Sequence, residues 1–226
     1  MITIRSLTKS HGGHTVLENV SADFLPGRVA YLLGPNGIGK TTLFTCLAGL
    51  TPYSGTVEFD GRPLARVRDE VFPVFDDCAL YPHLSGLKNL GLMLGRRVSW
   101  AEVREVAGGA LDRAVLVKPA RALSYGQRKK VYIAALLLAR PSYVFLDELA
   151  NGLDYDSLAW LREAIGRLAG SGATVVAAGH QFDFYDRVAD DVFAVSENGL
   201  RRLDHDHAEG DRLEDAYLAT RAEPAH

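Results

Sequence analysis

The chain has 226 residues, 47% of them hydrophobic and 23% charged, which is the composition of a globular protein able to bury a sizeable core. Its net charge of -3 argues against nucleic acid or an anionic membrane surface as the main partner, because both attract clustered lysine and arginine. The longest apolar run, residues 131–139, is far shorter than the roughly 20 residues that cross a bilayer, and no signal-peptide pattern opens the chain. Since Cys46 and Cys78 are the only cysteines, we expect no disulfide framework and a cytoplasmic location.

A glycine-rich loop lies between a predicted strand and a predicted helix. Residues 29–33 form a continuous apolar run, which is typical of a strand buried on both faces. After the loop, apolar side chains recur at helical spacing over residues 43–50, and we expect this helix to end at Thr51-Pro52. The local order is therefore strand, loop, helix.

Strand and helix patterns alternate along the rest of the chain. Residues 56–59 alternate in the manner of an exposed edge strand, and residues 71–75 predict another strand. The pattern over residues 84–123 is helical, which predicts a small helical subdomain over about residues 76–140. Further helices are expected at residues 131–139 and 158–168, and further strands at residues 143–146 and 174–178. This alternation predicts an α/β fold with a parallel sheet.

The C-terminal segment, about residues 204–226, is polar, and we expect it to fray. His205 and His207 flank Asp206 and could chelate a metal, but a solvated role is favoured in so polar a stretch. No internal repeat is visible, so residues 1–226 are expected to form one domain.

The loop segment GPNGIGKT, residues 34–41, fits the phosphate-binding pattern in which two glycines frame four residues and are followed by Lys and Ser or Thr. The backbone from Asn36 through Gly37 to Gly39 would turn successive N–H groups toward phosphate oxygens, and the following helix adds its positive end. A glycine-rich turn that matches by chance is the alternative. The predicted strand before the loop and the helix after it argue against that alternative.

Three side chains at the end of this loop have predicted roles toward a bound nucleotide. Lys40 would neutralise the charge of the β- and γ-phosphates, and Thr41 would supply an oxygen to Mg²⁺. Thr42 offers a further hydroxyl donor.

Two carboxylates end the predicted strand at residues 143–146. Ligands of open α/β sheets bind beyond the carboxyl ends of the strands, so Asp147 and Glu148 are expected near the phosphate loop. Asp147 can serve Mg²⁺ through oxygen, and Glu148 can polarise an attacking water. A solvated turn would explain two acids taken alone, but their pairing with a phosphate loop favours the site.

The segment LSYGQ, residues 123–127, precedes the apolar helix that runs to Ala139. Ser124 is well suited to cap this helix, and a hydroxyl with glycine amides at a helix start can bind an anion. Taken alone, the segment predicts only a helix cap.

These motifs resemble those of the ABC ATPase family in their order along essentially the whole chain. The phosphate loop, the LSYGQ segment and the strand that ends in Glu148 look like the family's Walker A loop, signature motif and Walker B strand. The segment NGLD, residues 151–154, looks like its D-loop, and His180 looks like its switch histidine. The resemblance implies a core with a parallel sheet, an N-terminal antiparallel β subdomain and a small helical subdomain that carries the signature.

The resemblance also implies ATP and Mg²⁺ as cofactors and a head-to-tail dimer, homodimeric or heterodimeric, with each ATP between two subunits. Ser124, Gly126 and Gln127 would then contact the γ-phosphate of the ATP held by the partner subunit. His180 would hydrogen-bond the γ-phosphate and the attacking water, and Asp154 of the D-loop counts among the nucleotide-binding residues.

Transport is the function that the resemblance favours. A separate transmembrane subunit would dock near residues 76–90 and hold this chain on the cytoplasmic face of the membrane. Leu80, Tyr81, Pro82 and Leu84 would give it an apolar surface, and internal packing of the helical subdomain is the alternative for each of them. The compact helical subdomain and the lack of an appended regulatory domain favour an exporter over an importer. Soluble ABC proteins that act on ribosomes or DNA are the alternative, although they usually carry tandem ATPase domains or a long coiled-coil insertion. A regulatory nucleotide sensor is disfavoured by the intact catalytic residues.

The chain departs from the commonest family pattern at four places. His11 stands where a tyrosine usually stacks on adenine, and imidazole offers less area for stacking. Asp76 takes the place of the Q-loop glutamine, where its carboxylate can ligate Mg²⁺ and meet the attacking water. Tyr125 replaces the first glycine of the signature, at a position expected to point outward, and Asn151 and Gly152 open the D-loop in place of the more usual small residues.

Overall fold

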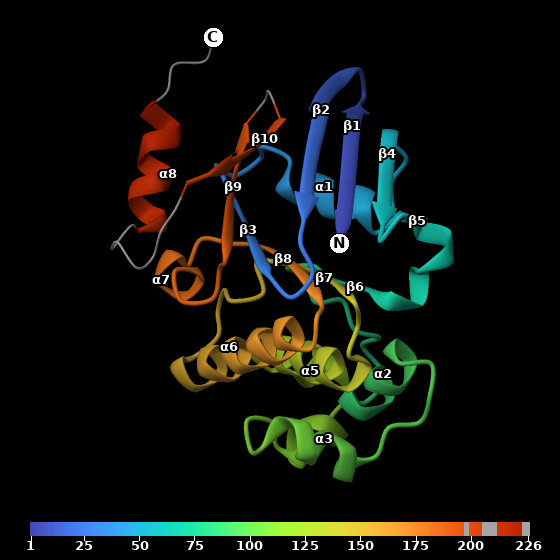
Figure 1. Ribbon diagram of the computed structural model, residues 1–226. Coiled ribbons are helices and arrows are strands. Elements are labelled where there is room, and N and C mark those ends of the chain that lie inside the picture. Colours follow the sequence, from blue (N-terminus) through green and yellow to red (C-terminus); the bar gives the residue numbers. More distant parts are fainter. Residues whose placement is uncertain (197–198, 205–211, 223–226) are drawn as a thin grey trace.

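A six-stranded sheet forms the centre of the computed structural model, which describes residues 1–196, 199–204 and 212–222 (Figure 1). The strand order is β10-β9-β3-β8-β7-β6, and every neighbouring pair is parallel except the edge pair β9 and β10. The strands are β3 (Val29–Leu33), β6 (Val71–Val74), β7 (Tyr143–Asp147), β8 (Thr174–Ala178), β9 (Asp191–Ser196) and β10 (Gly199–Leu203). The prediction of an α/β fold with a parallel sheet is confirmed.

A second, antiparallel sheet is built from the N-terminal part of the chain. Its order is β2-β1-β4-β5, from β1 (Ile2–His11), β2 (His14–Phe24), β4 (Ser54–Phe59) and β5 (Arg62–Pro63). The antiparallel β subdomain that the family resemblance implied is therefore present.

The alternation of side chains along β3 builds a core on each face of the central sheet. Ala30 and Leu32 face α1 (Lys40–Leu47) and the antiparallel sheet, whereas Val29 and Tyr31 face α5 (Tyr125–Ala139) and α6 (Tyr155–Gly170). All five residues of β3 are buried, as the continuous apolar run predicted. Figure 1 shows α1 beside the antiparallel sheet and α5 and α6 across the central sheet from it.

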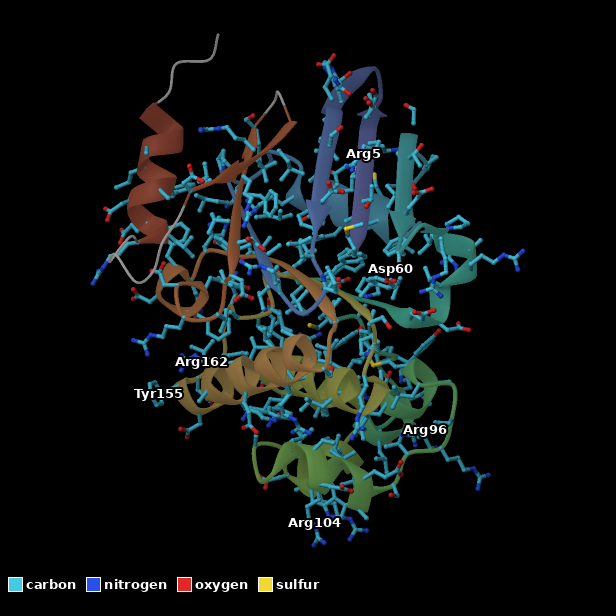
Figure 2. The ribbon with its side chains drawn as sticks, in the orientation of Figure 1. Arg5, Asp60, Arg96, Arg104, Tyr155 and Arg162 are labelled. Atoms are coloured by element: carbon cyan, nitrogen blue, oxygen red, sulfur yellow. The ribbon has the colours of Figure 1, made fainter. Side chains whose placement is uncertain are left out.

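Helices α2 (Gly86–Met93) and α3 (Trp100–Ala107) pack beside α5 in the lower part of Figure 1, and α4 (Arg113–Val117) packs against α2. Short 3₁₀ turns lie at η1 (Leu64–Arg66), η2 (Arg68–Glu70) and η3 (Ala120–Ala122). Serines cap three of the helices: Ser85 begins α2, Ser99 begins α3 and Ser124 begins α5. Figure 2 shows Arg96 and Arg104 on the outer side of this helical part, away from the sheet.

Helix α1 is shorter than the sequence pattern predicts. It ends at Leu47 instead of continuing to Thr51-Pro52. Gly49 has a positive φ of 67°, and its N–H donates to the carbonyl of Cys46, so a glycine in the left-handed region ends the helix before the proline is reached.

The C-terminal segment contains a helix, so the expectation that it frays is wrong for residues 213–222. Helix α8 (Leu213–Ala222) begins with Leu213 fully buried, and the backbone N–H of Leu213 donates to Asp186 at 2.9 Å. Tyr217 packs on Phe182 of α7 (Phe182–Tyr185) with ring centroids 5.3 Å apart. His205 and His207 lie outside the described residues. No helix within the described ranges is long and apolar enough to cross a membrane.

Candidate nucleotide-binding site

The predicted phosphate loop and the predicted acidic pair line one cavity of about 130 Å³. The cavity lies beyond the carboxyl ends of β3 and β7, where a parallel sheet binds its ligands. Eight residues line it, and all of them belong to these two motifs: Asn36, Gly37, Gly39, Lys40, Thr41, Thr42, Asp147 and Glu148.

Glycine is required in the loop for two separate reasons. Gly37 and Gly39 have positive φ angles of 82° and 112°, which other residues rarely adopt. A side chain at Gly39 would also approach the Leu17 side chain to 2.8 Å, because β2 packs directly against the loop. The loop thus leads into α1, whose first N–H groups have no acceptor within the helix and can face an anion.

The Lys40 ammonium is buried and held by the loop itself. Its Nζ donates to the carbonyl oxygens of Gly34 at 2.6 Å and Pro35 at 3.0 Å. Burial lowers the pKa of Lys40, and the nearby carboxylates of Glu148 and Asp147 oppose that shift. A charge this poorly hydrated is well placed to gain from contact with phosphate oxygens.

Thr41 and Asp147 form an oxygen pair at the base of the cavity. The Thr41 hydroxyl donates to Asp147 Oδ2 at 2.6 Å, and the Asp147 side chain is almost fully buried. Burial raises the pKa of Asp147, the Thr41 hydrogen bond opposes that shift, and the charges of Glu148 and Asp76 add to it. A hydroxyl and a carboxylate are hard oxygen ligands, so this pair fits Mg²⁺.

Each oxygen of the Glu148 carboxylate contacts a neighbouring side chain. Asn151 Nδ2 donates to Glu148 Oε2 at 2.6 Å, and His180 Nε2 lies 3.1 Å from Glu148 Oε1. His180 Nε2 is also 2.5 Å from Asn36 Oδ1 in the phosphate loop. Because both neighbours accept, His180 Nε2 carries the proton. Glu148 itself has a positive φ of 55°, which turns the chain sharply at the end of β7.

The strand order explains why His180 reaches both motifs. Strand β8 pairs with β3 on one side and with β7 on the other, so the residues after β8 emerge between the two loops. His180 follows Gly179 just beyond this strand. The structure therefore joins Asn36, His180 and Glu148, which are far apart in the sequence.

Several predicted residues do not line this cavity. His11 is exposed at the end of β1, and Asp154 caps α6 by accepting the N–H of Ser157 at 2.8 Å. Ser124 and Gln127 form a reciprocal capping box at the start of α5, which confirms Ser124 as its N-cap. Gly126 is next to them and approaches the D-loop at Gly152.

Asp76 also lies outside the cavity and is bound by two residues of α5. The Tyr125 hydroxyl donates to Asp76 Oδ1, and Lys129 Nζ lies 3.3 Å from the same oxygen. The expectation that Tyr125 simply points outward is therefore wrong, because its hydroxyl joins the signature to the Q-loop segment. Residue spacing alone gave no hint of this contact.

Two residues around Glu148 were not predicted as site residues. Asn151 was noted only as a departure from the family pattern, yet its amide holds the Glu148 carboxylate. Lys129 precedes the apolar run of α5 and is fully buried beneath the Glu148 turn. A lysine next to a long apolar stretch was the one available signal, because an uncompensated charge is rarely buried.

The relatives found by sequence agree with the motifs. Residues 17–151 match the sequence profile of the ABC transporter family. The lantibiotic transport ATP-binding protein SrtF of Streptococcus pyogenes is 32% identical over 227 residues, which cover 96% of each chain. The Nod factor export ATP-binding protein I of Cupriavidus metallidurans is 33% identical over 208 residues, which cover 86% of this chain and 68% of that protein.

Solved structures share the fold over almost the whole chain. The ATP binding subunit of an ABC transporter matches with a TM-score of 0.86 and 22% identity, over 97% of this chain and 98% of that chain. A dimeric ATP-binding cassette bound to ADP and Pi matches with a TM-score of 0.78 and 23% identity, over 90% and 98% of the two chains. At these identities the likeness concerns the fold.

Proposed function

Since this chain belongs to the ABC transporter family, as one of its ATP-binding and ATP-hydrolysing subunits, we propose that it drives export through a separate transmembrane partner. The observation that carries the ATPase part of the proposal is the single cavity that unites the phosphate loop, Asp147 and Glu148, with His180 bridging the two motifs.

We assign the hydrolytic roles from the contacts around this cavity. Lys40 neutralises the phosphates, and Glu148 accepts a proton from the attacking water as general base. His180 orients Glu148 and the loop residue Asn36 relative to each other, and its single Nε2 proton turns from these acceptors toward the γ-phosphate when ATP is bound. Asn151 holds the second oxygen of Glu148, which leaves the first oxygen to face His180 and the water.

Thr41 and Asp147 are the proposed ligands of Mg²⁺, because they already place two hard oxygens 2.6 Å apart. The ion supplies positive charge beside the phosphates when it is bound. Asp76 was also expected at the metal. One of its carboxylate oxygens instead contacts the Tyr125 hydroxyl and Lys129 Nζ, so we do not propose Asp76 as a ligand of Mg²⁺.

A dimer is proposed for the signature residues. Ser124, Gly126 and Gln127 begin α5 away from the cavity of their own chain, so they are free to meet the γ-phosphate of ATP on a second subunit. A cassette of the same fold is described as dimeric with ADP and Pi bound, which supports this arrangement. The second subunit is either another copy of this chain or a related ATPase.

The segment at residues 76–90 is the proposed docking surface for the transmembrane partner. Tyr81 is 66% exposed within it, although its backbone is held firmly. The buried Asn89 side chain accepts from the Tyr81 N–H at 2.8 Å and donates to the Tyr81 carbonyl at 3.2 Å. A fixed and exposed aromatic side chain is a common anchor of protein interfaces.

Purification from native membranes tests the transport proposal. We expect an integral membrane protein to be recovered with the tagged chain, and Tyr81→Glu to reduce its recovery at equal amounts of folded protein. Leu50→Glu is the control, because Leu50 is 62% exposed but lies outside residues 76–90. Recovery of ribosomal particles in place of a membrane protein would contradict the transport proposal.

The direction of transport is tested in vesicles that contain the recovered partner. Relatives named for export and for import both match 86% of this chain, as the Nod factor export protein and the L-cystine import protein TcyC of Bacillus subtilis do, so the proposal of export rests on the compact helical part. ATP added to inside-out vesicles should move cargo into their lumen, whereas cargo uptake into right-side-out vesicles that are loaded with ATP would indicate an importer.

A further inference from the structure

Lys129 is a fully buried lysine that lies directly under the catalytic turn, which begins at Glu148 and continues into the D-loop at residues 151–154. Its side chain has 0% exposure, and its Nζ donates to the carbonyl oxygens of Glu148 at 2.5 Å and Asn151 at 2.9 Å. These two carbonyls both belong to this turn. A charged group removed from water in this way remains stable only when it is fully compensated.

Asp76 supplies the compensating charge from a different part of the chain. Asp76 Oδ1 lies 3.3 Å from Lys129 Nζ, and the same oxygen accepts a hydrogen bond from the Tyr125 hydroxyl. The Tyr125 ring in turn lies under the ammonium, with Lys129 Nζ 4.4 Å from the ring centroid. The Asp76 carboxylate, the Tyr125 ring and the two carbonyls therefore surround one buried cation.

Tyr125 also packs against the far end of the same turn. A Cβ atom at Gly152 would come within 3.0 to 3.1 Å of two Tyr125 ring carbons, so this glycine allows the ring to approach the D-loop closely. Lys129 and Tyr125 are one helical turn apart on α5, which lets one helix face hold the turn at both ends.

We propose that Lys129 is a positioning residue for Glu148, and that Asp76 and Tyr125 complete a linkage from residues 75–80 through α5 to the catalytic turn. The proposal rests on the catalytic role assigned to Glu148 above. It departs from the sequence-based expectation for Asp76, because it directs the Asp76 carboxylate toward a buried lysine and not toward Mg²⁺. Its physical basis is that two carbonyls of a sharply turned segment share one cation, so loss of that cation frees the backbone that aims Glu148.

The test compares Lys129→Met and Asp76→Asn with the wild type. Methionine keeps the length and apolar stem of the lysine but removes the donor. Both variants should lower kcat, by up to about 10²-fold for Lys129→Met, since a misplacement of about 1 Å can have an effect of that size. The dissociation constant for MgATP should stay within about twofold, because the phosphate loop is untouched. Lys118→Met, at an exposed site on α4's C-terminal side, is the matched control.

A structural readout separates positioning from simple destabilisation. In folded Lys129→Met, amide hydrogen exchange in peptides that span residues 147–154 should become faster, with little change in peptides of β3. Tyr125→Phe removes only the hydroxyl and should give a smaller loss of kcat, which keeps the test usable if Lys129→Met does not fold. The effects of Asp76→Asn and Lys129→Met should not add in the double variant, because both act through one interaction.

Three results would overturn the proposal: wild-type kcat in both Lys129→Met and Tyr125→Phe, additive losses in the double variant, or a changed Mg²⁺ midpoint in Asp76→Asn. The last result would return Asp76 to the metal site. Glu148→Gln is measured in parallel. If Glu148→Gln retains turnover, the assigned catalytic role fails; if it loses turnover while Lys129→Met does not, only the linkage fails.

Discussion

Glu148→Gln tests the general base with little change in shape. The structure makes the consequence for the site specific, because the two carboxylate oxygens have different neighbours. Asn151 Nδ2 donates to Oε2, so the glutamine carbonyl must take that position. The glutamine NH₂ then faces His180 Nε2, which carries the proton between Asn36 and Glu148. His180 must change tautomer or move, and because its side chain is 36% exposed, water can replace the lost hydrogen bond at little local cost.

The loss of the base dominates this local cost. General-base catalysis contributes roughly 10²–10⁴-fold, which corresponds to about 3–5 kcal/mol in the activation free energy. We therefore expect at least about a 10²-fold lower rate in single-turnover hydrolysis, with MgATP binding by calorimetry close to that of the wild type. Glu163→Gln is the control, because Glu163 is an exposed glutamate of α6. A Glu148→Gln rate within threefold of the wild type would refute Glu148 as the base.

Lys40→Ala should weaken MgATP binding by at least about tenfold, because it removes the buried cation of the loop, and unchanged calorimetric affinity would contradict this assignment. Ser124→Arg in a Glu148→Gln background should bind ATP but fail to dimerise with it, and normal ATP-driven dimers in light scattering would exclude the shared site. The Glu102 capping box has a pH signature, since hydrogen bonds from Ser99 and Arg96 lower the pKa of Glu102 to about 2. A carboxylate whose pKa is lowered by folding stabilises the folded state at pH values above its pKa in the unfolded chain. This stabilisation is lost as the pH falls toward the lowered pKa. Glu102→Gln should therefore lower the melting temperature at pH 7, and the difference should shrink between about pH 4.5 and 2; a difference independent of pH would count against the charged box.

Local sequence patterns predicted the buried strand β3, the cap of α5 and the meeting of the phosphate loop with the acidic pair. The apolar run at residues 29–33 became the buried β3, and Ser124 three residues before Gln127 became a capping box. The phosphate loop and the acids after β7 meet because both follow strands of one parallel sheet, which the alternation of elements had implied.

Contacts between distant side chains could not be predicted in the same way. The ion pair of Asp76 with Lys129 joins residues 53 positions apart, and no periodicity records it. The resemblance to the family pointed Asp76 toward the metal, because glutamine at that place suggested an oxygen ligand. The end of α1 was missed for a smaller reason: Gly49 in the left-handed region outweighed the more conspicuous proline. Helix α8 was missed because its composition is polar, and its anchors are few: the buried Leu213 and the ring of Tyr217 on Phe182.

The place of His180 between the two loops makes its imidazole a natural spectroscopic reporter. A single ring nitrogen touches Asn36 on one side and Glu148 on the other, so any separation of the loops changes its hydrogen bonding at once. The chain contains seven histidines, few enough for their ring resonances to be resolved and assigned by substitution. The nitrogen shift of this one ring would follow the closing and opening of the site in solution, without any label that disturbs the loops themselves.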